Sequence, residues 1–284
     1  MKQLAVPTIL AFGEMLLIIS GMLDLSSGAV LALAGVYSVN IYKSTGSLVL
    51  AVIVAIIIGV ACNLINALMV ANFNTPPFIA TLAMQMAARG VALLYTQGQN
   101  ILQLGDFTIF GQGSIGPIPI SIILMAVITV VIWYLLKHTR FGRSLYAIGG
   151  NEETAIASGI NVFRNKYMVF GVNGILVGIA GVLFMSRVNA GLPNGAVGYE
   201  MEGLTAAIVG GTSFSGGVGT TLGTLAGAFI IGCLNNIMNL VGVDSYVQQI
   251  VKGVIIALAV IWDIQSKTKK TKKIILVEET KKEA

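Results

Sequence analysis

The chain has 284 residues, of which 56% are hydrophobic and 10% charged, with a formal net charge of +5 and a mean hydropathy of +0.87. This small number of charged groups cannot cover the surface of a soluble protein. The composition therefore excludes a soluble enzyme and predicts a polytopic helical membrane protein. The single histidine, His138, excludes a histidine-based metal cluster and a catalytic triad, and we expect no cofactor.

Long apolar segments predict the membrane spans, because a helix needs about 20 apolar residues to cross the hydrocarbon core. The expected spans, in chain order, are residues 5–22, 28–42, 46–71, 78–95, 119–136, 167–186, 203–213, 218–240 and 246–264. Two are short: 28–42 is marginal, and 203–213 has the length of a half-helix. The predicted fold is an all-α transmembrane bundle of about nine spans in residues 1–264, followed by a basic tail, 265–284.

Basic residues are concentrated in two segments, which sets the predicted orientation. Twelve of the 17 Lys and Arg residues lie in the loop 137–166 or in the tail. The positive-inside rule places both segments in the cytoplasm. An even number of crossings must separate them, so 203–213 with its flanks is expected to cross as a broken helix. The loops 96–118 and 187–202 are then expected to face outward.

The same count places the N-terminus on the outer side. Five crossings precede the cytoplasmic loop, so Met1 is expected outside, with only Lys2 to orient the first span. This unusual arrangement predicts a further helix upstream of Met1, and therefore that the 284-residue form is truncated.

A short capped helix is expected at the centre of the cytoplasmic loop. Asn151 is a good N-cap, and Glu152 and Glu153 place negative charge at the positive end of the helix dipole. Gly159 can take the left-handed conformation that ends a helix. The sequence therefore predicts a helix over Glu152–Ser158, and its hydrophilic, basic setting marks it as the contact with a partner that does work on the protein.

Polar side chains within the spans mark the candidate translocation path. They occur as pairs three or four residues apart, which puts both members on one helix face. The pairs are Asn63 with Asn66, Gln85 with Arg89, and Asn235 with Asn239. Such groups are costly in lipid and should point inward, but interhelical hydrogen bonding explains them equally well. Arg89 lies close enough to the outer end of its span to reach water.

Glu14 is the one carboxylate expected well within a span. An ion-coupled secondary carrier would need paired intramembrane carboxylates, so the sequence disfavours that class. Asp24, two residues after the first span, is expected to cap the following helix.

Glycines recur every four residues in two segments, and one nucleotide-binding pattern does not occur in the sequence. Small residues that recur every four positions let helix backbones approach closely. They are Gly174 and Gly178, and Gly219, Gly223 and Gly227. The pattern GxxxxGK[ST] does not occur in the sequence, so any ATP that drives the protein must be bound by another chain.

Five sequence blocks occur in a fixed order along the chain. They are SGMLDLSSG at 20–28, PFIATLAMQMAARGVALLYTQG at 77–98, FGRSLYAIGGNEETAIASGINV at 141–162, GYEMEGLTAAIVGGTSFSGGVGTTLGT at 198–224 and LNNIMNLVGVDSYVQQIVKG at 234–253. Together they resemble the membrane permease subunit of ribose-type ABC sugar importers. The resemblance runs from residue 11 to residue 263.

The resemblance implies a multi-pass permease of the bacterial inner membrane that moves a ribose-like monosaccharide. It implies three protein partners besides membrane lipid: an extracytoplasmic sugar-binding protein, a cytoplasmic ATPase subunit and a second permease subunit. In such importers the ATPase contact is a loop related to E-A-A-x-x-x-G. The positions that match it here are Glu153, Thr154, Ala155 and Gly159, with Thr154 in place of the usual alanine.

Four alternatives stay open at this point. One is an ion-coupled carrier that works alone, and another is a structural or assembly protein with no conduction pathway. The other two are ABC permeases for nucleosides or for branched-chain amino acids. The family also has about ten spans as a rule, one more than the sequence predicts here.

Overall fold

The computed structural model describes the backbone of residues 2–282 and the side chains as far as Gln265, so most of the predicted tail 265–284 lies outside the described side chains. The elements are η1 (Lys2–Leu4), α1 (Ala5–Ile19), α2 (Ser27–Thr45), α3 (Leu48–Asn72), α4 (Pro77–Thr96), β1 (Ile101–Leu102), η2 (Gly105–Thr108), α5 (Ile109–Gln112), β2 (Ser114–Ile115), β3 (Ile118–Pro119), α6 (Ile120–His138), α7 (Arg140–Gly150), α8 (Glu152–Ala157), α9 (Val162–Val188), β4 (Ala190–Gly191), α10 (Tyr199–Val209), α11 (Thr221–Leu240) and α12 (Ser245–Lys282). The strands form two small antiparallel ribbons, β1 with β4 and β2 with β3. The fold is all-α, as predicted.

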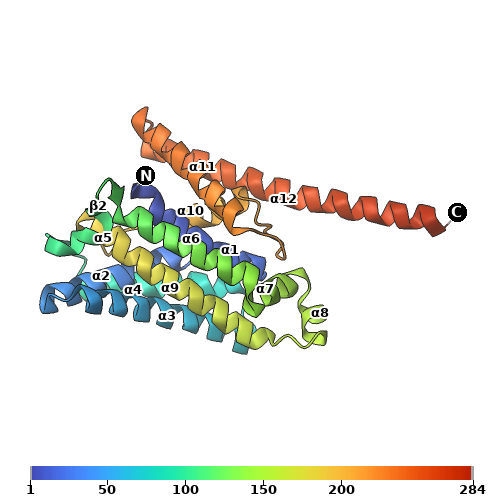
Figure 1. The fold of residues 1–284 in the computed structure, drawn as a ribbon, viewed down its shortest axis with the longest axis horizontal. Helices are drawn as coiled ribbons and strands as arrows, with labels where there is room; N and C mark the ends of the chain where they lie inside the picture. The colour runs from blue at the N-terminus through green and yellow to red at the C-terminus, as the bar shows by residue number, and fades with distance from the viewer. Residues whose placement is uncertain (1, 283–284) are drawn as a thin grey trace.

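The bundle has two ends, which we name the α8 end and the N-terminal end (Figure 1). Lys2 Nζ donates to Gln112 O over 2.7 Å, and Arg187 Nη1 donates to Gln3 O over 3.3 Å. These bonds join the start of the chain to α5 and to the last turn of α9. The N-terminus and the two loops predicted to face outward therefore share one end of the bundle, opposite the loop that holds α8.

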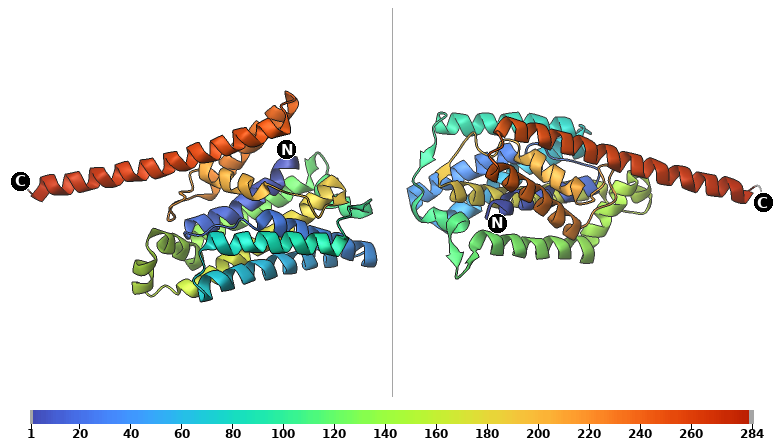
Figure 2. Two further views of the ribbon diagram at one scale, coloured as in Figure 1. Left: turned by 180° about the vertical axis from the view of Figure 1, so that it is seen from behind. Right: turned by 90° about the horizontal axis from the view of Figure 1, so that it is seen from above.

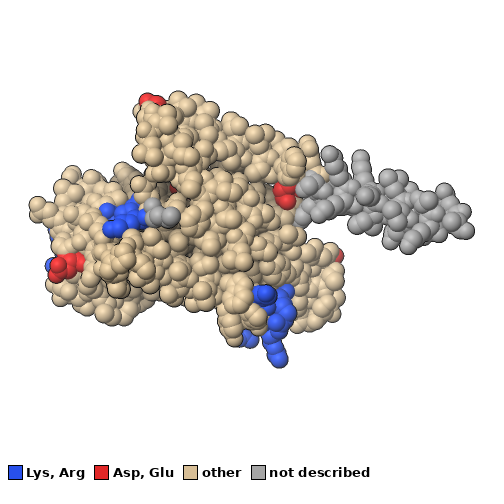
Figure 3. Space-filling view, turned by 45° about the horizontal axis from the view of Figure 1, so that its top comes forward, with Lys and Arg blue, Asp and Glu red and all other residues tan. Residues whose placement is uncertain are grey.

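α1 lies at the centre of the bundle, and all its residues except Pro7 are buried. A helix that is apolar all round belongs inside the protein. By contrast, none of the described side chains of α12 is buried, and the helix projects beyond the bundle (Figure 2). On the face shown in Figure 3, the surface between the two ends of the bundle is largely uncharged, as expected of a protein that faces lipid.

Seven of the nine predicted spans are helices long and apolar enough to cross a membrane. The exceptions are the two segments whose apolar runs are short. α2 has 19 residues, and its buried residues lie between Ser27 and Val39, so protein rather than lipid surrounds this part of the helix.

α10 has only 11 residues and completes half of a crossing. Before it, the backbone from β4 to Gly198 is irregular. After it, the chain reaches the α8 end, where Gly217 N donates to Ile19 O over 2.9 Å. Irregular backbone at membrane depth is tolerated where protein buries it. This is the broken helix that the charge distribution predicted.

Close helix crossings account for the glycine spacing. A Cβ on Gly174 would lie 2.6 Å from Gly59 O, so α9 meets α3 backbone to backbone, and Gly178 makes the same approach one turn later. On α11, a Cβ on Gly227 would lie 2.1 Å from Ala206 O of α10. The prediction of close packing at these positions is confirmed.

The loop 137–166 holds two helices where the sequence predicted one. α7 precedes α8, and Thr139 Oγ1 caps it by accepting from Gly142 N over 3.1 Å. Leu145 and Ile148 are buried on its inner face. An isolated helix of 11 residues is marginal in water, so α7 depends on packing that the glycine-rich local sequence does not reveal.

Candidate functional site

Both predicted caps of α8 are confirmed. Asn151 Oδ1 accepts from Thr154 N over 2.7 Å at the start of the helix. Gly159 has φ +79°, and the amide of the next residue donates to Ala155 O over 3.0 Å, which closes the C-terminus. The helix spans Glu152–Ala157, one residue shorter than predicted.

α8 is held firmly on its inner side. Ala155 is buried against Ile148 of α7 and Val162 of α9. Lys166 Nζ lies 2.9 Å from Glu152 Oε1, and this ion pair ties the first turn to α9. The exposed outer surface is formed by Glu153, Thr154 and Ile156. A short helix with a fixed base and a free outer face is suited to bind a partner protein.

Asn63 and Asn66 are completely buried within a group of polar side chains that we call the polar cluster. Its members are Glu14, Asp24, Ser26, Ser27, Asn63, Asn66 and Asn173. Asn66 Nδ2 donates to Ser26 Oγ over 3.1 Å, and Asn63 Oδ1 accepts from Asn173 Nδ2 over 2.9 Å. These bonds join α3 to α9 and to the segment before α2, which favours the interhelical hydrogen-bonding interpretation for both residues.

Asp24 connects three parts of the polar cluster. Its Oδ1 accepts from Ser26 N over 2.7 Å. Ser26 is itself the N-cap residue of α2, and no side chain makes a capping bond there, so the prediction that Asp24 caps this helix is wrong: it holds the residue before the helix instead. Its Oδ2 accepts from Asn173 Nδ2 over 2.7 Å, and its own amide donates to Glu14 Oε2 over 3.3 Å. Asn173 could not be singled out from the sequence, because its single amide in an apolar run has no polar neighbour at helical spacing.

Gln85 of α4 binds the first turn of α10, and Arg89 of α4 binds the segment before that helix. Gln85 Nε2 donates to Glu200 Oε1 over 3.2 Å. Arg89 Nη1 donates to Pro193 O over 2.7 Å and to Gly195 O over 2.8 Å. The half-buried guanidinium of Arg89 thus satisfies carbonyl groups of the irregular half of the crossing, a role beyond the predicted reach to water.

Three carboxyl groups lie together inside the bundle, where the sequence predicted one. Glu14, Asp24 and Glu200 are all buried. Ser27 Oγ donates to Glu14 Oε1 over 3.3 Å, and a Cβ on the next residue, Gly28, would lie 2.0 Å from Glu200 Oε2. The start of α2 thus brings the carboxyl groups together. The expectation of a sole carboxylate failed because the sequence assigned Asp24 and Glu200 to loops.

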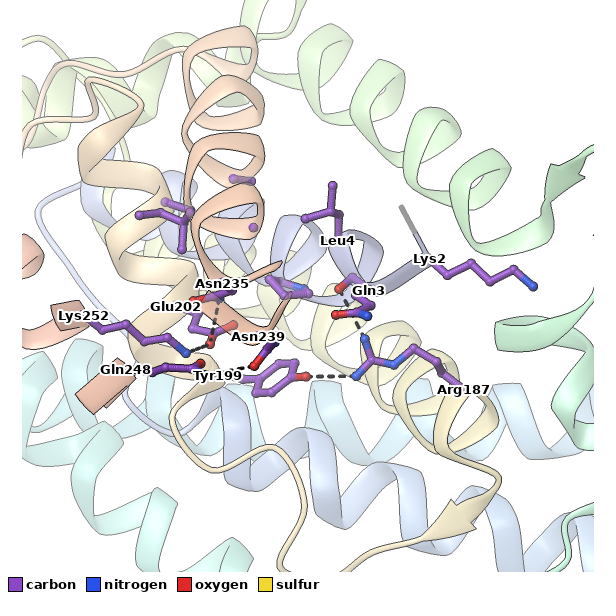
Figure 4. A pocket seen from close by; sticks show the side chains of 15 residues that line it. Lys2, Gln3, Leu4, Arg187, Tyr199, Glu202, Asn235, Asn239, Gln248 and Lys252 are labelled. Carbon is purple, nitrogen blue, oxygen red and sulfur yellow. Dashed lines mark hydrogen bonds and ion pairs between the residues drawn. The ribbon is translucent and has the colours of Figure 1, made fainter. Parts of the chain in front are cut away.

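Asn235 and Asn239 line a cavity of about 470 Å³ at the N-terminal end, which we call the polar pocket. Figure 4 shows side chains of Glu202 from α10, Asn239 from α11 and Lys252 from α12 converging on it. Its polar lining residues are Lys2, Gln3, Arg187, Tyr199, Glu202, Asn235, Asn239, Gln248 and Lys252. Two of the five candidate path residues thus share a cavity, while Asn63, Asn66 and Gln85 make hydrogen bonds elsewhere in the bundle.

Hydrogen bonds hold the lining of the polar pocket in place. Gln248 Nε2 donates to Asn239 Oδ1 over 2.9 Å, and Asn235 Nδ2 donates to Glu202 Oε1 over 3.3 Å. Glu202 also forms an ion pair with Lys252. Amide groups offer both donors and acceptors, so this lining suits a solute rich in hydroxyl groups. Among the described residues, no three His, Cys, Asp or Glu side chains are arranged to hold a metal ion.

Known proteins are similar in sequence to this chain over most of its length. Residues 1–260 match the family described as "Branched-chain amino acid transport system / permease component". The chain is 43% identical over 266 residues to the ribose import permease protein RbsC of Bacillus subtilis (strain 168), covering 93% of this chain and 83% of the relative. It is 40% identical over 268 residues to the ribose import permease protein RbsC of Escherichia coli (strain K12), covering 93% and 84%.

A more distant relative extends the comparison. The D-allose transport system permease protein AlsC of Escherichia coli (strain K12) is 34% identical over 263 residues, covering 92% of this chain and 81% of the relative. No solved structure matches the chain. With a family match over residues 1–260 and relatives at 43% and 40% identity, the chain belongs to this family of transport-system permease components.

Proposed function

We propose that this chain is the membrane-spanning subunit of an ABC importer that carries a ribose-like monosaccharide across the bacterial inner membrane. The names of its relatives support this: those at 43% and 40% identity are ribose import permeases, and one at 34% is an allose permease. The sequence contains no P-loop motif, so ATP hydrolysis belongs to a partner chain.

The polar pocket is the observation that carries the proposal. Its volume of about 470 Å³ lies within the range of small-molecule sites, about 300–1,000 Å³. Sugar hydroxyl groups both donate and accept hydrogen bonds, as do the side chains of Asn239 and Gln248. The pocket lies at the end of the bundle that the charge distribution places outside, where a binding protein would release its sugar.

The partners follow from the two ends of the bundle. The outer face of α8 is the proposed contact with a cytoplasmic ATPase subunit, through Glu153, Thr154 and the exposed side chain of Ile156. An extracytoplasmic sugar-binding protein would dock at the N-terminal end, above the polar pocket. A second permease subunit would complete the transporter.

The direct test is uptake by the reconstituted transporter. The chain is placed in proteoliposomes with an ATPase subunit and a binding protein from the same genome, and radiolabelled ribose, allose and leucine are offered with ATP inside. We expect ATP-dependent uptake of a pentose or hexose that excess leucine does not inhibit. Uptake of leucine alone would mean that the transported solute is a branched-chain amino acid and not a sugar. Uptake driven by an ion gradient without ATP would overturn the proposal.

Gly159→Ala should impair the coupling of α8 to the ATPase. The substitution forces a Cβ into a left-handed backbone at a cost of about 1–2 kcal/mol, so the capped end of α8 is displaced. We expect sugar-stimulated ATP hydrolysis to fall roughly fivefold. Gly150→Ala is the matched control, because that glycine has ordinary φ and open space around its Cβ position. Equal hydrolysis by both variants would remove α8 from the ATPase contact.

A further inference from the structure

We infer that Tyr146, Gly149 and Asp263 are positioning residues for transport, which tie the α7–α8 unit to the walls of the polar pocket through one glycine-rich loop. This inference rests on the proposed function, because it links the proposed ATPase contact to the proposed sugar pocket. The loop comprises residues 210–220, between α10 and α11, and we call it the glycine loop.

The first link joins the glycine loop to α7 through its backbone. A Cβ on Gly149 would lie 1.7 Å from Ile19 O and 2.6 Å from Gly217 N, and one on Gly216 would lie 2.7 Å from Gly149 O. No side chain separates the two segments there. One turn earlier, Tyr146 Oη donates to Gly219 O over 2.7 Å. Burial raises the pKa of Tyr146, so its hydroxyl keeps this proton at neutral pH.

The second link joins the glycine loop to α12. Asp263 Oδ2 accepts from Ser213 Oγ over 2.9 Å and from Phe214 N over 3.0 Å. The loop is also closed on itself, since Ser213 N donates to Val218 O over 3.0 Å. One compact turn is therefore bonded to α7 on one side and to α12 on the other.

The glycine loop also continues directly into α10 and α11, two further helices that line the pocket. A Cβ on Gly223 of α11 would lie 2.2 Å from Gly210 O, so α10 and α11 leave the loop in close contact. Farther along these helices lie Glu202 and Asn235, and Lys252 lies on α12. Three of the helices that line the pocket, α10, α11 and α12, are thus attached to one loop, and that loop rests on α7.

Such a connection transmits displacement well. Close-packed backbone contacts have no rotamers to absorb a shift, so a movement of α7 and α8 must move the loop with it. The same shift would then change the spacing of α10, α11 and α12 around the pocket. Packed elements of this kind turn small displacements at one site into larger rearrangements elsewhere.

The test measures the number of sugar molecules taken up for each ATP hydrolysed in proteoliposomes. Tyr146→Phe removes only the hydroxyl group, and we expect the ratio to fall about fivefold, the factor that one net hydrogen bond is worth. Tyr167→Phe is the matched control: its hydroxyl donates to Asn72 Oδ1 over 2.6 Å, also at the α8 end, without touching the glycine loop. Ser213→Ala, which weakens the link to α12, should lower the ratio as well.

The outcomes separate this inference from the proposed function. Copurification of the ATPase subunit and an unchanged melting temperature show that assembly and folding are intact in each variant. A wild-type ratio in both Tyr146→Phe and Ser213→Ala would overturn the link, as would an equal fall in Tyr167→Phe. Absence of sugar uptake by the wild-type transporter would instead overturn the proposed function.

Discussion

Replacing Asp24 with alanine should lower the free energy of unfolding by about 3 kcal/mol. Its carboxyl group is fully buried and accepts from Ser26 N, Ser26 Oγ and Asn173 Nδ2. Alanine leaves the Ser26 amide and one Asn173 proton without an acceptor, and each such buried group costs about 1–3 kcal/mol. Denaturant unfolding of the purified protein in detergent measures the loss.

Two further variants make this test specific. Asp106→Ala removes an exposed carboxylate and should change stability by less than about 0.5 kcal/mol. Asp24→Asn keeps one acceptor for the Ser26 amide, so its loss should fall between the other two. If Asp24→Ala unfolds at the same denaturant concentration as the wild type, the polar cluster is not a structural brace of the bundle.

The sequence predicted the helices well because hydrophobicity alone decides which segments can cross a membrane. Seven of the predicted spans are long apolar helices, and the two short ones, 28–42 and 203–213, are those that depend on surrounding protein. Local chemistry was equally informative at α8, where Asn151 caps the start of the helix and Gly159 follows its end. Signals that need only neighbouring residues can be recognised without a structure.

The polar cluster could not be predicted for the opposite reason. Its members come from α1, the segment before α2, the start of α2, α3 and α9, and each contributes one or two residues. Glu200 is brought beside them by an irregular backbone that no periodicity describes. The contact of Gly149 with the glycine loop has the same origin: two glycine-rich blocks of sequence more than 60 residues apart meet only in the folded bundle.

Sequence spacing also cannot separate structural amides from amides that face a cavity. Asn63 with Asn66 and Asn235 with Asn239 each share one helix face. The first pair meets Ser26 and neighbouring helices in the buried interior, whereas the second lines a cavity. The difference lies in what packs opposite each pair, which is a property of the tertiary structure.

Asn239→Leu should lower the initial rate of sugar uptake roughly thirtyfold, because the pocket loses a donor and an acceptor for sugar hydroxyls and each hydrogen bond is worth about 1 kcal/mol. The side chain is exposed in the pocket, so the melting temperature should stay close to that of the wild type. Asn236→Leu is the matched control, since this exposed amide lies on the same helix but does not line the polar pocket. Uptake is measured in proteoliposomes with the ATPase subunit and the binding protein present. Equal rates for the two variants would mean that the sugar crosses the bundle by another route, because Asn239 lines the polar pocket and Asn236 does not.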